Sequence, residues 1–323
     1  MRGEPRSPAS RDRRARGDPD AAAPATLAPR ANPDLVGHEA AERALRRFYD
    51  QDRLPHALLL CGPRGIGKAT LAFRFARFLL ARPGPAEAGE GLAVDSASGA
   101  FRRVAAGGHA DLLTVERAWD PRRQRLRGEI LVDDAREIAL FLHLTPAEEG
   151  WRIVVVDGAE EMNTSAANAL LKILEEPPQR SLLLLVSHNP GRLLPTIRSR
   201  CRRFVLAAPE PGLVRQLILR HRPELDASEA AALAELAEGS VGRALELADA
   251  GGLALYRSLV EILASLPAVD LPALHAFADR LARPEAEEGF RTAADLLGQF
   301  LARLAAGAAR REAAAFDAEI VAG

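Results

Sequence analysis

Apolar residues follow two patterns along the chain: short unbroken runs, and longer stretches with helical spacing. The unbroken runs predict buried strands at 57–60, 112–115, 153–156, 182–186 and 203–206. The helical spacing predicts helices between them at 40–48, 69–80, 132–144 and 165–175. Strands that alternate with helices predict an α/β fold, in which helices cover both faces of a parallel sheet.

After Pro209 the strand signals disappear. Helical spacing there predicts six more helices, at 213–220, 228–237, 242–249, 254–266, 271–281 and 291–311. The Gly251-Gly252 pair is a candidate boundary within this helical part. Residues 1–32 mix Arg, Pro, Ala and Asp without periodicity, which predicts a disordered tail. The stretch 81–108 is rich in Pro, Gly and Ala and predicts a long loop.

Composition narrows the classes of function. The 323 residues carry a formal net charge of −1, which excludes a globally basic nucleic-acid coat but leaves room for a local basic patch. Two cysteines, Cys61 and Cys201, exclude a disulfide framework and a four-cysteine zinc site, and we expect both to be buried thiols. No apolar run approaches the ~20 residues that cross a bilayer, and no apolar signal segment opens the chain. We therefore expect a cytoplasmic protein.

Residues 62–68, with the sequence GPRGIGK, lie between a predicted strand and a predicted helix, the context of a phosphate-binding loop. Its backbone N–H groups surround phosphate oxygens, and its lysine pairs with the terminal phosphates. The nucleotide-binding candidates in this loop are Gly62, Gly65, Gly67 and Lys68. The next residue is Ala69, where a working loop has a Ser or Thr hydroxyl for Mg²⁺. Thr70 lies about 100° further around the helix and is a poor substitute.

Three more residues carry candidate chemistry. Asp157 ends an apolar run, as expected for a strand end that faces Mg²⁺. Arg200, in a Ser-Arg-Cys sequence, belongs either to a solvated basic turn or to a subunit edge, where a guanidinium reaches a neighbour's γ-phosphate. Lys172 is either a contact to DNA phosphate or an exposed helix lysine paired with Glu175 or Glu176, and we favour the ion pair.

These residues together resemble a known family. The resemblance rests on the phosphate-binding loop, Asp157, residues 132–136, the Ser-Arg-Cys sequence, and NALLKILEEPP at 168–178. They are similar to the AAA+ clamp-loader subunits of bacterial DNA polymerase III, for which the NALLKxLEEPP stretch is especially specific. The resemblance covers about 32–249 well. Beyond Gly251 it rests only on a helical pattern and a matching length.

The resemblance implies an architecture and a set of partners. After the tail over 1–32 it implies a RecA-like P-loop (AAA+) domain with a parallel sheet at 33–207, a helical lid at 208–250, and a helical collar at 251–323. It implies a hetero-pentamer with delta and gamma or tau subunits. This assembly holds primer-template DNA and loads the sliding clamp during DNA replication, associated with the nucleoid through the replisome. DNA synthesis, a nucleotidyltransferase reaction, belongs to other chains of the polymerase holoenzyme.

Departures from the family pattern refine this expectation. In hydrolysing members a glutamate that orients the attacking water follows the acid at 157, and this chain has Gly158. Together with Ala69, this indicates the non-hydrolysing delta-prime branch, in which Arg200 would act as an arginine finger in the ATP site of a neighbouring gamma or tau subunit. We expect no intrinsic ATPase activity and no required cofactor, with weak ATP or ADP binding left open. A gamma/tau-like ATPase and an unrelated nucleotide-binding scaffold are the alternatives.

Three other family features bear on ligands. Many members carry a four-cysteine zinc module after the P-loop helix, but residues 81–108 hold no cysteine, so no zinc is expected. The lid arginine of ATP-binding members follows a Gly-Ser-x-Arg pattern, and here Arg243 comes one position late. In the sensor region Ser187, His188 and Asn189 end a strand, and we expect His188 to be a satisfied surface histidine.

Overall fold

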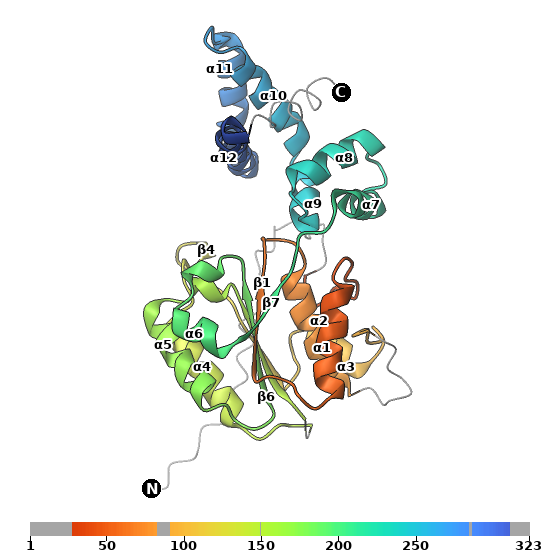
Figure 1. Cartoon of the computed structure of the whole chain (residues 1–323). Helices are drawn as coiled ribbons and strands as arrows, with labels where there is room; N and C mark the ends of the chain where they lie inside the picture. Colours follow the sequence, from red (N-terminus) through yellow and green to blue (C-terminus); the bar gives the residue numbers. More distant parts are fainter. Residues whose placement is uncertain (1–27, 83–90, 149, 284–285, 311–323) are drawn as a thin grey trace.

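The computed structural model describes residues 28–82, 91–148, 150–283 and 286–310, and Figure 1 shows their arrangement. Most of the tail predicted over 1–32 lies outside the described residues, and so do residues 83–90 of the predicted loop. The α/β fold is confirmed: a parallel sheet with helices on both faces is followed by a helical part. No helix in these four described ranges has both the length and the apolar character needed to cross a membrane.

Five parallel strands form the main sheet, in the order β2-β5-β6-β1-β7. The strands are β1 (Ala57–Cys61), β2 (Leu112–Val115), β5 (Arg152–Asp157), β6 (Ser181–Ser187) and β7 (Arg202–Val205). The central strands β5, β6 and β1 are buried almost throughout, which explains why they are unbroken apolar runs and not alternating ones. Because all five strands run in one direction, the segments that follow β1, β2, β5 and β6 meet at one edge of the sheet.

Two groups of helices cover the sheet (Figure 1). One face carries α1 (Glu39–Asp50), α2 (Lys68–Ala81) and α3 (Gly99–Ala105), and the other carries α4 (Val132–His143), α5 (Thr164–Glu175) and α6 (Pro195–Arg200). Successive residues of β1 enter different cores, as the period of a strand requires. Leu58 shares a core with Phe75 of α2, and Leu59 shares the other core with Leu170 of α5. The apolar strands therefore pack against helices on both faces of the sheet and hold the two helix layers to it.

The prediction of a continuous loop over 81–108 is wrong, because α3 lies within it. The Ser98 hydroxyl caps α3 by accepting a hydrogen bond from the N–H of Phe101, at 3.1 Å. Phe101 is buried, and the guanidinium of Arg77 lies 4.6 Å from its ring centroid. A seven-residue helix is too short to show a clear period in a Gly- and Ala-rich sequence, and packing stabilises it instead. The sequence patterns also missed the short hairpin β3 (Trp119–Asp120) and β4 (Arg125–Leu126), and the turns η1 (Ala159–Glu161) and η2 (Pro190–Arg192).

The six helices predicted after Pro209 are confirmed. They are α7 (Pro211–His221), α8 (Ala227–Leu236), α9 (Val241–Asp249), α10 (Gly252–Ala264), α11 (Leu271–Leu281) and α12 (Glu287–Arg310). One apolar cluster runs through α7 to α10 and α12 and contains Tyr256 and Leu296. Helix α8 begins with a capping box, in which Asp226 and Glu229 each accept a hydrogen bond from the other's N–H. In Figure 1 this helical part stands beyond the sheet edge at which the parallel strands end.

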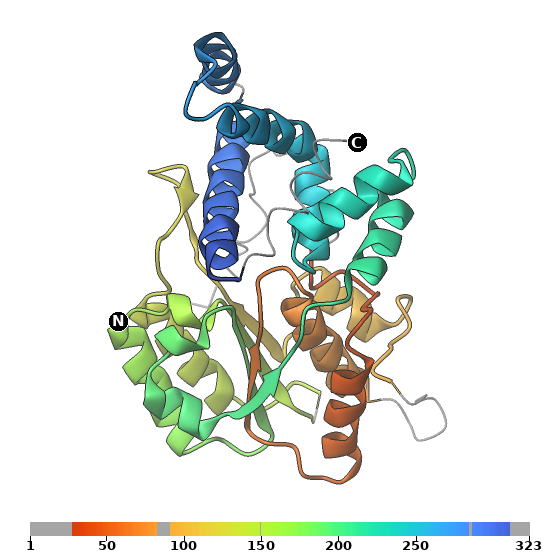
Figure 2. The ribbon, with the colours of Figure 1, turned by 45° about the horizontal axis from the view of Figure 1, so that its top comes forward.

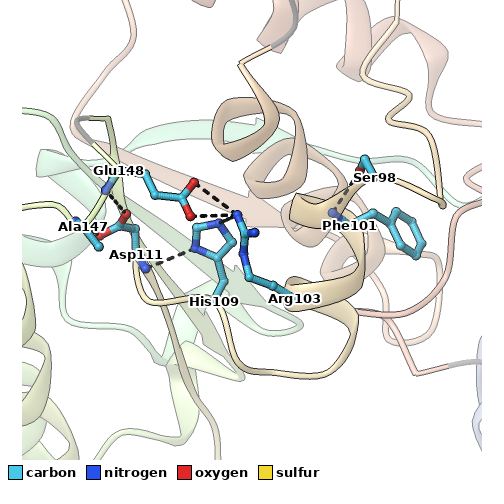
Figure 3. A network of polar contacts seen from close by, with 7 residues as sticks. All are labelled: Ser98, Phe101, Arg103, His109, Asp111, Ala147 and Glu148. Atoms are coloured by element: carbon cyan, nitrogen blue, oxygen red, sulfur yellow. Dashed lines mark hydrogen bonds and ion pairs between the residues drawn. The ribbon is translucent and has the colours of Figure 1, made fainter.

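A polar network fastens the opposite edge of the sheet, where β2 begins (Figure 3). The carboxylate of Asp111 is buried and accepts hydrogen bonds from the N–H groups of Ala147 (2.8 Å) and Glu148 (3.1 Å). The Nδ1 atom of His109 accepts from the N–H of Asp111 at 3.2 Å, and Arg103 of α3 donates to the Glu148 carboxylate at 2.8 Å. Burial lowers the pKa of His109, and the nearby Arg103 lowers it further. The network ties α3 and the segment after α4 to the sheet, away from the phosphate-binding loop.

Candidate functional site

The predicted phosphate-binding loop joins β1 to α2, which begins at Lys68. The Nζ atom of Lys68 donates a hydrogen bond to the carbonyl of Pro63 in the same loop. Burial lowers the pKa of Lys68 to about 8, although the carboxylates of Asp157 and Glu160 favour its charged form. At neutral pH most Lys68 side chains are therefore still protonated. The ammonium group can release the Pro63 carbonyl and bind an anion in its place.

A cavity of about 440 Å³ opens beside this loop. Its wall includes the charged side chains of Arg64, Lys68 and Asp157 and the apolar side chains of Leu35, Leu217 and Leu245. Pockets for small ligands have volumes of roughly 300–1,000 Å³ and combine apolar walls with a few polar groups. A nucleotide has the matching chemistry, with charged phosphates at one end and an apolar base face at the other. The residues present thus fit the phosphates and base of a nucleotide.

Asp157 ends β5, as predicted, and lies on the wall of the same cavity as Lys68. Burial raises its pKa to about 6, and the nearby Glu116 raises it further, whereas Lys68 acts in the opposite direction. The structure therefore brings together the loop lysine and the strand-end acid, which are 89 positions apart in the sequence. Ala69 and Thr70 both line this cavity. Ala69 offers no oxygen to the cavity. Thr70 does border the cavity, although its position about 100° further around α2 suggested that it would point away.

The residue after Asp157 has a backbone that only glycine adopts readily. Gly158 has φ +75° and ψ +50°, in the left-handed region, and it begins the turn η1. A Cβ atom at this position would lie 2.6 Å from the Oε2 atom of Glu161, whose carboxylate pairs with Arg117 at 2.8 Å. The water-orienting glutamate is therefore missing, and a side chain at 158 would strain the backbone and require the Glu161 carboxylate to move.

Glu160 of η1 contacts the sensor region, where His188 follows the end of β6. A carboxylate oxygen of Glu160 accepts hydrogen bonds from the N–H groups of His188 (2.8 Å) and Asn189 (3.1 Å), so Glu160 holds this strand end and does not replace the missing glutamate. His188 is half-buried on the cavity wall, and its Nδ1 atom has no partner among the described residues. The expectation of a satisfied surface histidine is wrong. Burial lowers the pKa of His188, and Lys68 lowers it further.

The helical part closes over the loop through Ser240, which begins α9. The Ser240 Oγ atom caps α9 by accepting from the N–H of Arg243, and it lies 1.9 Å from the place where a Cβ atom of Gly65 would be. Gly65 therefore allows the loop to approach α9 closely. The side chain of Arg243 extends to α12, where its Nη1 atom lies 3.8 Å from Asp295. Val241 and Gly242 of this segment line the cavity, whereas Arg243 is not among the lining residues.

Arg200 lies at the end of α6, a short helix where the sequence suggested a turn. Its Nη2 atom is 2.8 Å from the Oε1 atom of Glu175, and its Nη1 atom donates to the carbonyl of Thr196 at 3.1 Å. The side chains of Arg200 and Glu175 are 36% and 50% exposed. Arg200 is not among the described residues that line the cavity beside the phosphate-binding loop. The arginine is therefore accessible from outside and separate from the chain's own loop.

The prediction that Lys172 forms an ion pair with Glu175 or Glu176 is wrong. Lys172 is exposed on α5, and no ion pair joins it to Glu175 or Glu176 within the described part of the chain. Glu175 pairs with Arg200 instead. Sequence analysis missed Glu175 as a partner of Arg200, although it lies inside the NALLKILEEPP stretch, because the pair forms only when α6 packs beside α5.

Cys61 and Cys201 are both buried, as predicted. Burial raises the pKa of Cys61, and it raises the pKa of Cys201 to about 12, so both remain thiols. Within the described ranges, no group of three or more His, Cys, Asp or Glu side chains is placed to hold a metal ion. The expected absence of zinc stays a prediction.

Comparison with known proteins shows that residues 37–210, which include the phosphate-binding loop, match one family. A family model described as "DNA polymerase III, delta subunit" matches residues 37–210. The DNA polymerase III subunit delta' of Pseudomonas aeruginosa is 41% identical over 187 residues, which make up 57% of this chain and 53% of that protein. The DNA polymerase III subunit gamma/tau of Mycobacterium tuberculosis is 33% identical over 187 residues, 58% of this chain and 30% of that protein. The matches thus span about half the length of the first relative and less of the second.

A solved structure aligns over a larger part of the chain. It is a DNA polymerase III gamma subunit-related protein from Thermotoga maritima, with a TM-score of 0.42 and 23% identity, and the alignment covers 78% of this chain and 76% of that one. The segment matched by the family model contains the phosphate-binding loop, Asp157, Gly158 and Arg200.

Proposed function

Since the chain belongs to the DNA polymerase III delta-subunit family, we propose that it acts as the delta-prime subunit of a bacterial clamp loader. In this proposal the chain does not hydrolyse ATP itself. It helps to place the sliding clamp on primed DNA, in the cytoplasm and at the nucleoid through the replisome. Polymerisation belongs to other chains of the holoenzyme. The identity to the delta' relative, which exceeds that to the gamma/tau relative, supports this choice.

Gly158 is the observation that carries the proposal. Its left-handed backbone, and the contact of 2.6 Å that a Cβ atom would make with Glu161, disfavour a side chain at the position where hydrolysing members have the glutamate that orients water. Ala69 removes the hydroxyl that binds Mg²⁺ as well. Lys68, Asp157 and the glycines of the loop remain as a degenerate nucleotide site, which requires no cofactor and leaves weak ATP or ADP binding open.

Arg200 is the residue that we propose to act outside its own chain. An arginine that stabilises the transition state of a neighbouring subunit must be exposed, and its own site must not use it. The side chain of Arg200 meets both conditions, because it is 36% exposed and is absent from the described wall of the chain's own cavity. Its planar guanidinium is suited to bind two oxygens of a γ-phosphate. We propose the ATP site of an adjacent gamma or tau subunit as its target.

The helical part supports assembly with other subunits. Phe290, Leu297, Leu301 and Leu304 of α12 are between 37% and 57% exposed, and three of them recur at intervals of three or four residues. Such a recurrence places apolar side chains on one face of the helix, and this face stays partly exposed among the described residues. We propose 251–323 as the collar of a hetero-pentamer with delta and gamma or tau subunits, 208–250 as the lid, 33–207 as the RecA-like domain, and 1–32 as a tail. The sliding clamp and primer-template DNA are the remaining proposed partners.

A gamma/tau-like ATPase remains the second candidate. The open cavity with Lys68 and Asp157 on its wall favours it, because a site that had lost all nucleotide chemistry would have no need of either group. The two candidates differ in one measurable property. A delta-prime subunit has no turnover alone and changes the turnover of its neighbours, whereas an ATPase subunit turns over ATP by itself.

Copurification followed by an ATPase assay tests the proposal. The full chain is expressed with delta and gamma or tau subunits, and DNA-stimulated ATP hydrolysis of the purified complex is measured. We expect the complex still to form with Arg200→Ala, and its hydrolysis to fall several-fold. The loss is smaller than the ~10³-fold or more of a single arginine finger, because other interfaces keep their own arginines. Arg202→Ala, on the exposed edge strand β7, is the matched control and should leave hydrolysis unchanged. Failure to copurify, or Mg²⁺-dependent turnover by the isolated chain, contradicts the proposal.

A further inference from the structure

The hairpin formed by β3 and β4 is an exposed basic segment to which the proposed function assigns no role. Residues 117–127 contain five arginines and one acid, Asp120, in a chain whose formal net charge is −1. Every residue from 121 to 129 is exposed. In Figure 2 the hairpin, drawn in olive, rises away from the sheet, and it follows the end of β2 at the same edge as the phosphate-binding loop.

The hairpin has a defined shape and is not a loose loop. Asp120 pairs with Arg125 and Trp119 pairs with Leu126 in an antiparallel register, and the N–H of Arg127 donates to the carbonyl of Ala118 at 2.8 Å. The Asp120 carboxylate accepts hydrogen bonds from the N–H groups of the turn, and Gln124 closes the turn with φ +51°. Alternation along a strand places Arg125 and Arg127 on one side of this ribbon and Leu126 on the other.

Three of the five guanidinium groups are available to a ligand. Arg117 is paired with Glu161 at 2.8 Å, and Arg123 lies 3.9 Å from Asp120. The arginines Arg122, Arg125 and Arg127 form no ion pair with any described residue. Like charges gathered on a two-stranded ribbon repel one another, and an external anion relieves this repulsion.

We propose that the hairpin binds the phosphate backbone of duplex DNA. The major groove of B-form DNA admits a two-stranded β-ribbon, so the width of the element fits between phosphate strands. Protein–protein interfaces also use arginine, so docking to a protein is the competing outcome of the test below. The inference extends the proposed function, in which DNA is a partner, by naming the surface that meets it. It depends neither on Arg200 nor on the nucleotide site.

Fluorescence of Trp119 provides a local measurement in the full chain. The side chain of Trp119 is 45% exposed within the hairpin, and Trp151→Phe removes the other tryptophan. In this background we expect a short DNA duplex to change the Trp119 signal, and the affinity to fall with salt. Replacing Arg122, Arg125 and Arg127 together by Ala removes up to three phosphate contacts. The magnitude of the slope of log K against log salt should then be smaller by up to about 2.7.

Replacing Arg43, Arg47 and Arg53 together by Ala is the matched control. These three exposed arginines lie on and just after α1, on the other side of the sheet, and their replacement changes the net charge equally. We expect this control variant to keep the slope of the parent. Equal losses in both triple variants, or no DNA signal from the parent at low salt, overturn the inference.

Two outcomes separate this inference from the proposed function. Suppose the hairpin variant keeps the parent's slope of log K for DNA against log salt but no longer copurifies with delta and gamma or tau. The hairpin is then a protein-docking surface, and the inference is wrong. If the parent fails to copurify with those subunits and yet shows the salt-dependent Trp119 signal, the proposed function fails and the hairpin inference stands.

Discussion

Arg200 and Glu175 form an ion pair, with 2.8 Å between Nη2 and Oε1, that joins the end of α6 to the end of α5. Both side chains are partly exposed, so the pair faces solvent at the edge of the sheet domain. In the proposed complex the same guanidinium meets a phosphate of the neighbouring subunit. The carboxylate of Glu175 then competes with that phosphate for one cation.

Glu175→Gln is expected to tighten the nucleotide-dependent assembly of the complex. An exposed ion pair is worth at most about 1 kcal/mol, which corresponds to a change of up to about fivefold in an equilibrium constant. Titration of the variant chain against ATP-loaded partner subunits measures this constant. The double variant with Arg200→Ala should behave like Arg200→Ala alone. A loss of assembly as large as that of Arg200→Ala would mean that Glu175 orients the arginine and does not compete for it.

Ala69→Thr combined with Gly158→Glu is expected to give no ATPase activity. A glutamate at 158 must adopt a left-handed backbone, which costs roughly 1–2 kcal/mol for a residue with a Cβ atom, and it must displace Glu161 from Arg117. Thermal unfolding should therefore show a lower Tm for the double variant than for Ala69→Thr alone. A double variant with an unchanged Tm and steady Mg²⁺-dependent turnover would show that the backbone at 158 is no obstacle.

The two cysteines are expected to resist thiol reagents in the folded chain. Burial raises the pKa of Cys201 to about 12 and also raises that of Cys61, so at about pH 8 neither forms the reactive thiolate. Labelling followed by mass measurement should find neither modified before denaturation and both modified after it. The single variants Cys61→Ser and Cys201→Ser assign any signal. Rapid labelling of Cys201 alone would reveal that α6, with Arg200 at its end, opens in solution.

His109 is expected to make folding sensitive to mild acid. Burial lowers the pKa of His109 in the folded chain, whereas the unfolded chain takes up a proton below about pH 6.5. The stability that depends on neutral His109 is therefore present above about pH 6.5 and is lost as the pH falls below it. Thermal unfolding between about pH 7 and pH 5 should show a steeper fall in Tm for the wild type than for His109→Gln.

His275→Gln is the control for this pH dependence, because His275 lies exposed on α11. It should follow the wild-type Tm across the whole range. If His109→Gln has the same pH dependence as the wild type, protonation of another group governs acid unfolding.

Local sequence patterns were sufficient to predict the strands and helices that form the layered core. Buried strands in a parallel sheet need apolar residues on both faces, so the run around Leu59 identifies β1 without knowledge of its neighbours. The loop 62–68 could be predicted for a similar reason, since its glycines and lysine are adjacent in the chain. A helix of seven residues such as α3 has no such signal, because its stability comes from the burial of Phe101 against Arg77.

By itself the sequence determined the fold class, the position of the loop and the missing hydroxyl at Ala69. Each of these depends on residue types at short spacing. Only the tertiary structure decided that Glu175 holds Arg200, that the Nδ1 atom of His188 has no partner among the described residues, and that Gly158 has a left-handed backbone. These properties depend on distances between segments far apart in the chain and on backbone angles. Packing selects both, and one-dimensional periodicity does not encode them.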